Sequence, residues 1–321
     1  MTSARLIYVD LGRVSEYADS VRGLDYVEVS DKELDDTSYE AAERQYLAKD
    51  SSKAIRLFNS YLNEFPSGIH ALNAHFYLAQ LYYKEDLKQN AEPHYEYVTN
   101  KPNGEFTETA LTRLSEIVLI DKNWTEAIPL LKRLENEADF PQNVVFAQSN
   151  LMKANYQLEN YSEAVTYAEK VLRNSKVDKN VKSDAHVIIA RSAIKTGDVD
   201  KAKEAYAQVE RIASGELAAE ALFYSAYFKN KAGNFESSNT VVKKLAKDYS
   251  SYKYYAAKGL IVMAKNYYEL DEAYQATYIL ESVIENFSEF DDVTSEAQIE
   301  LTRIKTEEAK TNSSVDTDNG N

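Results

Sequence analysis

A short pattern of turn, aromatic and small residues recurs along the chain at a nearly constant distance. In one copy the turn position is Glu159, Tyr161 follows two residues later, and the small residue Ala164 follows after three more. We call this last position the small slot. Its occupants are Tyr17, the one large residue, and then Ala54, Ala91, Ala127, Ala164, Ala202, Ser238 and Ala276, at gaps of 36 to 38 residues. Such constancy over the whole chain indicates an array of structural repeats.

The residues around the small slot have the spacing of two helices. Four residues after the slot, on the same helical face, stand Val21, Phe58, Tyr95, Leu131, Ala168, Tyr206, Val242 and Leu280. Twelve residues before it stand Ala42, Ala79, Ser115, Met152, Ala190, Ala226 and Ala264, most of them small. Two small positions at this offset let antiparallel helices approach closely. Each unit is therefore predicted to be a helix, a short turn and a second helix.

These residues resemble the tetratricopeptide repeat, which has small residues at two close-contact positions and an aromatic residue where its second helix begins. The resemblance covers roughly residues 38–290 and implies an all-α, right-handed superhelical solenoid of about seven full helix pairs. The chain departs from the family in two ways: the usual period is 34 residues, and the Trp and Gly of the family's first helix are absent. The extra residues are expected in loops, where insertions cost little. HEAT-like helical pairs are the alternative fold.

The repeat register divides the chain into five parts. Residues 1–23 are predicted to be a partial repeat, 24–37 an acidic linker, 38–292 seven repeats, 293–310 a capping helix and 311–321 a disordered, polar tail. The acidic linker lacks the spacing and central glycine of a calcium loop. Because the first repeat lacks the start of its first helix, we expect the chain to be the C-terminal part of a longer protein, with its natural start upstream of Met1.

Composition and charge narrow the range of partners. Thirty-seven basic and 52 acidic residues leave a net charge of −15, which repels the phosphates of nucleic acids and anionic lipids. The chain has no cysteine, so disulfides and thiol chemistry are excluded. No apolar run approaches the ~20 residues that span a bilayer. We therefore expect a protein or peptide partner, with no nucleic acid and no direct insertion into a membrane.

The sequence offers no set of residues for catalysis. The four histidines, His70, His75, His94 and His186, include no pair at the i, i+4 spacing of a helical metal site. There is no glycine-rich phosphate loop and no nucleophile elbow. Acidic residues are plentiful, but on charged helices they are most often a solvated face. We therefore expect a protein that is not an enzyme and has no cofactor and no metal.

The resemblance implies a binding groove lined by the first helix of each repeat. The candidate positions lie eight and eleven residues before the small slot. The candidates at the first position are Tyr46, Tyr83, Tyr156 and Tyr268, and those at the second are Gln80, Lys153, Arg191, Tyr227 and Lys265. Tyrosine offers apolar area and a hydroxyl at low entropic cost, which suits binding surfaces. It also fills gaps between stacked helices, and that alternative stays open for each tyrosine.

The sequence therefore predicts a non-catalytic scaffold or adaptor that holds a partner peptide or helix in this groove. Two alternatives are a self-associating structural segment, which allows homo-oligomers, and a regulatory part of a longer protein whose active domain lies upstream. In its tyrosine-rich repeats the chain also resembles long tetratricopeptide proteins of the bacterial cell envelope. That resemblance implies a periplasmic or outer-membrane-associated role in assembly or secretion, in preference to a cytoplasmic one.

Overall fold

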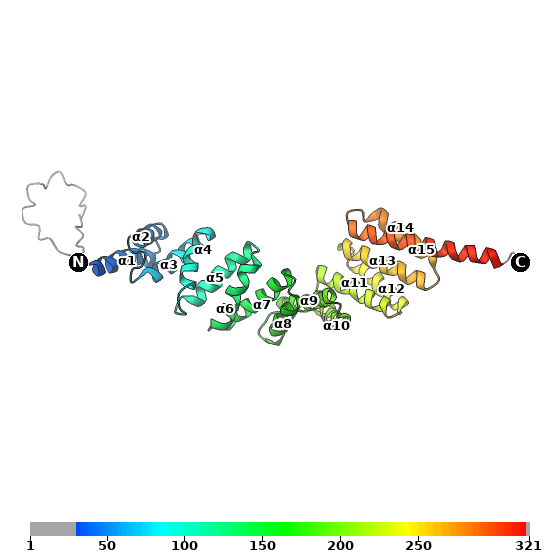
Figure 1. The fold of residues 1–321 in the computed structure, drawn as a ribbon, viewed down its shortest axis with the longest axis horizontal. Helices are drawn as coiled ribbons and strands as arrows, with labels where there is room; N and C mark the ends of the chain where they lie inside the picture. The colour runs from blue at the N-terminus through cyan, green and yellow to red at the C-terminus, as the bar shows by residue number, and fades with distance from the viewer. Residues whose placement is uncertain (1–29, 319–321) are drawn as a thin grey trace, which may run out of the picture. The chain divides into compact units, whose positions relative to one another are not determined.

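The computed structural model describes residues 30–318 of the chain, with side chains to residue 310 (Figure 1). Within this range it contains fifteen α-helices and no strand. The helices are α1 (Asp31–Leu47), α2 (Ser51–Glu64), α3 (Ala71–Lys84), α4 (Lys88–Thr99), α5 (Thr107–Ile120), α6 (Trp124–Glu137), α7 (Pro141–Gln157), α8 (Tyr161–Arg173), α9 (Lys179–Thr196), α10 (Val199–Ile212), α11 (Gly215–Lys231), α12 (Phe235–Asp248), α13 (Lys253–Glu269), α14 (Ala273–Asn286) and α15 (Asp291–Asp318). The all-helical prediction is confirmed.

The helices form two compact units, divided between Val144 and Val145 within α7. In the first unit α1 packs on α2, α3 on α4 and α5 on α6, and successive pairs also contact one another. In the second unit each helix from α8 to α15 packs on the next. Here α13 also contacts both α11 and α15, so first helices of successive pairs touch directly. The helices thus follow the predicted order of seven pairs and one additional helix.

The predicted register coincides with the core. All seven small slots in the described residues, from Ala54 to Ala276, are completely buried. The seven residues twelve positions earlier, from Ala42 to Ala264, are also completely buried. The small residues let the two helices of a repeat approach closely. Large neighbouring side chains such as Phe58 and Tyr95 are then completely buried between them. The one polar slot, Ser238, donates its hydroxyl to the carbonyl of Ala226 at 2.8 Å.

The turn inside each repeat has a left-handed residue five positions before the small slot. These residues are Lys49, Asp86, Lys122, Glu159, Gly197, Gly233 and Asp271, with φ between 57° and 77°. The N–H of the next residue donates to the carbonyl five positions earlier, as from Asn160 to Asn155 at 2.9 Å. This arrangement is the Schellman helix ending, which uses a left-handed residue to satisfy the last carbonyls. Only two of the seven positions carry the glycine that this conformation favours.

The predicted acidic linker is wrong over residues 31–37, which belong to α1. Ser30 caps this helix: its hydroxyl accepts from the N–H of Glu33, whose carboxylate accepts from the N–H of Ser30. Asp35 is buried and accepts from the hydroxyl of Tyr61 at 2.6 Å and from the N–H of Ile69 at 2.8 Å. Two of these acidic residues, Glu33 and Asp35, therefore stabilise the start of the repeat array. The predicted partial repeat at 1–23 lies outside the described residues.

The C-terminal helix is longer than predicted. Val293, Ala297, Leu301 and Ile304 of α15 are buried in one cluster with α13 and α14, as expected for a capping helix. The helix continues to Asp318, so residues 311–318 are helical where disorder was predicted. Adding residues to a helix already fixed by packing avoids the cost of a new nucleus, which favours continuation into polar sequence. In the part of the chain the model describes, no helix combines the length and apolarity that a membrane span requires.

Candidate partner-binding groove

The second unit contains a groove of about 600 Å³. It is lined only by residues of the first helices α7, α9, α11, α13 and α15. The lining residues are Tyr156, Arg191, Ile194, Lys195, Glu220, Phe223, Tyr224, Tyr227, Asn230, Lys231, Tyr254, Tyr255, Lys258, Val262, Lys265 and Glu296. The groove is therefore made of aromatic rings and charged groups in roughly equal measure.

Helical spacing explains how so many side chains reach one groove. On α11 the lining residues Glu220, Tyr224, Tyr227 and Lys231 follow one another at three- or four-residue intervals, which keeps them on one face. The lining residues of α13 repeat the same spacing one helix further along. The small core residues of these helices, such as Ala226 and Ala264, are buried and do not line the groove.

A buried carboxylate organises the centre of the groove. The side chain of Glu220 is only 3% exposed. It accepts from Arg191 Nε at 2.8 Å and from a second guanidinium nitrogen at 2.5 Å, in a bidentate pair. The hydroxyls of Tyr206 and Tyr255 donate to it at 2.7 Å and 3.0 Å. Burial by itself raises the pKa of Glu220, but Arg191 and the two hydroxyls outweigh burial and hold that pKa below its usual range.

The second carboxylate of the groove is also neutralised internally. Glu296 on α15 accepts from Lys258 Nζ at 2.6 Å and from Lys265 Nζ at 2.8 Å. Two lining cations, Lys195 and Lys231, are exposed and have no carboxylate partner among the described residues. Five cations thus face two carboxylates, and the groove is positive although the whole chain is strongly negative.

Four of the nine candidate residues from the sequence line this groove. They are Tyr156 on α7, Arg191 on α9, Tyr227 on α11 and Lys265 on α13. Each is only partly buried, so part of each side chain faces the groove. Their contact with a partner remains a prediction.

Two further candidates of the second unit lie outside the groove lining. Lys153 is exposed and forms an ion pair with Asp184 at 2.7 Å. The ring of Tyr268 lies under the guanidinium of Arg303, 4.9 Å from its centroid. Tyr268 on α13 therefore contacts α15, the helix that follows the last repeat.

The remaining three candidates belong to the first unit. Tyr46 packs against Tyr77 with ring centroids 4.6 Å apart. Tyr83 donates its hydroxyl to Glu116 at 2.7 Å. Gln80 is half-buried on α3. For the two tyrosines, contact between neighbouring helices is thus the role that the structure displays.

Several groove residues were missed because only two register positions were considered. Tyr224 and Val262 lie fourteen residues before their small slots, and Glu220 and Lys258 lie eighteen before them. These positions continue the chosen helical face by one and two turns toward the N-terminus. Extending the register in steps of three or four residues from Tyr227 finds them.

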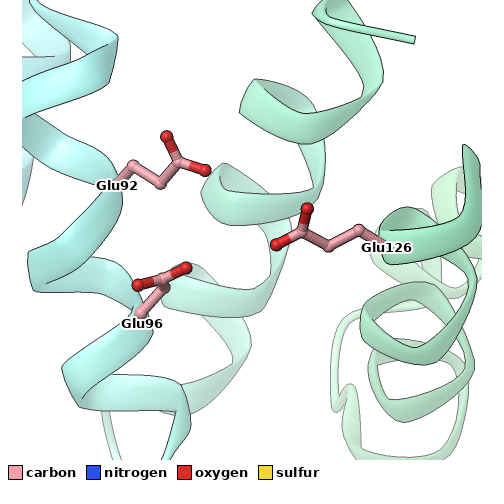
Figure 2. A group of neighbouring side chains, drawn as sticks. All are labelled: Glu92, Glu96 and Glu126. Carbon is pink, nitrogen blue, oxygen red and sulfur yellow. The ribbon is translucent and has the colours of Figure 1, made fainter. Parts of the chain in front are cut away.

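The first unit brings three carboxylates together between α4 and α6. Oxygens of Glu92, Glu96 and Glu126 lie within 4.8 Å of one another, and Figure 2 shows Glu126 reaching toward the two residues of α4. Burial, followed by the neighbouring carboxylates, raises the pKa of Glu92. Groups of this kind are frequent on acidic proteins, so the geometry by itself does not identify a metal site.

The first unit also holds a histidine pair that the sequence spacing did not reveal. His75 on α3 and His94 on α4 face each other with their Nδ1 atoms 2.8 Å apart. The i, i+4 spacing does not reveal them because they are nineteen residues apart, on two neighbouring helices. His75 also stacks on Tyr97 at a centroid distance of 3.8 Å. Burial first, then His94 and Lys101, lowers the pKa of His75 to about 4.

Comparison with known proteins gives one family match and several similar folds. Residues 184–211, which span parts of α9 and α10, match the family model of the tetratricopeptide repeat. No curated protein matches the sequence. The C-terminal part of a tetratricopeptide repeat-containing protein from Cytophaga hutchinsonii is 13% identical, with a TM-score of 0.52 over 80% of this chain and 98% of that chain.

Two further solved structures are similar to this chain. A signal transduction ATPase with a tetratricopeptide repeat sensor, from Pyrococcus horikoshii, is 14% identical with a TM-score of 0.52. It aligns over 85% of this chain but only 44% of its own. A tetratricopeptide repeat protein from Parabacteroides merdae is 14% identical with a TM-score of 0.39, over 82% of this chain and 98% of that chain. At these identities the likeness is one of fold. Residues 184–211, in the fifth of the seven helix pairs, thus match the tetratricopeptide repeat, and the chain has the helical-repeat fold of such proteins.

Proposed function

We propose that this protein is a scaffold that holds an acidic segment of a partner protein in the groove of its second unit. The tetratricopeptide-repeat fold suggests a scaffold for protein–protein interaction, and proteins of this kind bind proteins or peptides and are generally not catalytic. The observation that carries the finer proposal is the positive, tyrosine-rich lining of the groove in a chain of net charge −15.

The charge of the partner is inferred from the groove cations that have no carboxylate partner within the groove. Arg191 is held by Glu220, while Lys258 and Lys265 share Glu296. Lys195 and Lys231 are left to pair with carboxylates of a ligand. Rings of Tyr224 and Tyr227 beside them offer apolar area for the ligand's non-polar side chains. An extended acidic segment with interspersed apolar residues fits both features.

A charge-reversal experiment tests the proposal. The double substitution Lys195→Glu and Lys231→Glu changes two exposed side chains of the groove. The matched control, Lys243→Glu and Lys247→Glu, makes the same change in net charge on α12, which lines no part of the groove. Binding of a fluorescein-labelled peptide of alternating glutamate and leucine is measured by fluorescence anisotropy at low and high salt.

We expect the groove variant to bind at least tenfold more weakly than the wild type, and the control to bind within about twofold of it. Equal losses in both variants would show that only the overall charge matters and would overturn the assignment of the groove. The role in assembly or secretion at the bacterial cell envelope stays a prediction from the resemblance described above.

A further inference from the structure

A second surface of the molecule is exposed on α14, a helix that contributes nothing to the groove. Tyr274 is 79% exposed and Tyr278 is 63% exposed. Glu281 and Glu285, also exposed, follow Tyr274 at seven and eleven residues, so all four share one helical face. We call these four residues the α14 stripe.

The tyrosines of the stripe are not required by the repeat. They lie two residues before and two residues after the small slot Ala276, which is completely buried without them. The six other described repeats have no aromatic residue at either position. Their pairs are Ser52 and Arg56, Gln89 and Pro93, Thr125 and Pro129, Ser162 and Thr166, Asp200 and Glu204, and Glu236 and Thr240. Packing inside the repeat therefore does not explain two large rings facing solvent.

The charges of the stripe define the chemistry that would cover it. Glu281 forms an ion pair with Lys305 at 2.8 Å, in which both side chains are about half exposed. Glu285 has no ion-pair partner among the described residues. Tyrosine faces attract lysine and arginine through cation–π contacts, and the neighbouring carboxylates attract the same cations.

We propose that the α14 stripe binds a lysine- and arginine-rich segment of a partner protein. This surface is separate from the groove and has the opposite charge preference, so the inference does not depend on the function proposed for the groove. The negative charge of the whole chain already disfavours the other common ligands of aromatic surfaces, nucleic acids and anionic lipids.

The first variant of the experiment leaves the net charge unchanged. In the double variant Tyr274→Ser and Tyr278→Thr, the stripe receives the two residues that the fourth repeat carries at the same positions, Ser162 and Thr166. The probe is a fluorescein-labelled peptide of alternating arginine and alanine, and binding to the full chain is followed by fluorescence anisotropy. Circular dichroism verifies that the variant is folded.

We expect about a tenfold loss of affinity for the basic peptide in the tyrosine variant, because two cation–π contacts are removed. We expect a similar loss in Glu281→Gln with Glu285→Gln, compared with little change in the control Glu204→Gln with Glu236→Gln. Binding by the tyrosine variant equal to that of the wild type would overturn the proposal, since attraction by overall charge would then explain the binding. Absence of binding to the wild type would overturn it as well. The groove variant Lys195→Glu with Lys231→Glu serves to separate the two proposals, because it leaves the stripe intact.

Discussion

The histidine pair between α3 and α4 predicts that the first unit loses stability in mild acid. In the observed geometry one Nδ1 of His75 and His94 donates to the other, so at most one of the two facing nitrogens carries a proton without repulsion. Burial lowers the pKa of both rings, that of His75 to about 4. In the unfolded chain each ring returns to a pKa of about 6.5.

The sign of the effect follows from the protons bound in each state. Between pH 6.5 and pH 4 the unfolded chain binds more protons at His75 than the folded chain does. Stability that is fully present above pH 6.5 is therefore lost as the pH falls toward 4. For His75 alone the linkage relation gives a loss of about 2 kcal/mol at pH 5. Because the ring is only half-buried, we expect about 1–2 kcal/mol.

The single tryptophan makes this loss measurable in the first unit. Trp124 begins α6, and the chain has no other tryptophan, so its fluorescence during urea unfolding reports on the unit that holds the histidine pair. Unfolding free energies at pH 7 and pH 5 are compared for the wild type and for His75→Asn, which keeps a polar group near the position of Nδ1 and does not titrate. Carboxylates that titrate in the same range contribute equally to both proteins and cancel in the difference. The reasoning is refuted if the variant loses as much stability between pH 7 and pH 5 as the wild type.

Three further predictions concern stability and are measured by urea unfolding. Lys122→Gly is expected to stabilise the chain by about 0.5–1 kcal/mol, because Lys122 has a left-handed backbone conformation that glycine adopts without strain. Gly197→Ala is expected to destabilise the chain by a similar amount for the same reason. Effects of the opposite sign contradict this explanation of the turns. Ala164→Leu is expected to cost at least about 1–3 kcal/mol because the small slot has no free volume, and a neutral effect would show that the slot does not limit helix approach. Arg191→Ala is expected to cost about 3–5 kcal/mol by leaving the buried Glu220 charged and unpaired, with partial recovery when Glu220→Gln is added; additive losses in the double variant contradict the pairing.

The core could be predicted from the sequence because it depends on one local rule repeated at fixed distance. A small residue at the slot and another twelve residues earlier determine how closely two helices approach, and these positions, such as Ala79 and Ala91, are all fully buried. The conformation of the turn was harder to predict from the sequence. A left-handed residue recurs in every described repeat, yet only Gly197 and Gly233 are of the residue type that favours this conformation.

The ends and the groove were harder to predict because they depend on contacts between distant residues. The acidic stretch before the first repeat resembles a linker in composition. Asp35 is nevertheless buried, and it accepts from the hydroxyl of Tyr61 on α2 and from the N–H of Ile69 in the turn before α3. Tyr83 and Tyr156 occupy the same register position, yet Tyr83 is bonded to the neighbouring helix and Tyr156 lines the groove. The neighbouring residues of the next repeat decide between these roles, and the register position by itself does not.

The internal pairing of the groove determines how its charge responds to the surroundings. A carboxylate as buried as that of Glu220 would ordinarily take up a proton readily, because burial disfavours its charged form. Arg191, Tyr206 and Tyr255 reverse this tendency, and the two lysines do the same for Glu296 against its own burial. Both carboxylates therefore stay ionised from neutral pH into mild acid, and their cations stay paired with them. The charge that the groove offers to a ligand then comes from Lys195 and Lys231, which are exposed and therefore screened by salt. Binding in this groove should accordingly depend on ionic strength much more than on pH between neutrality and mild acid.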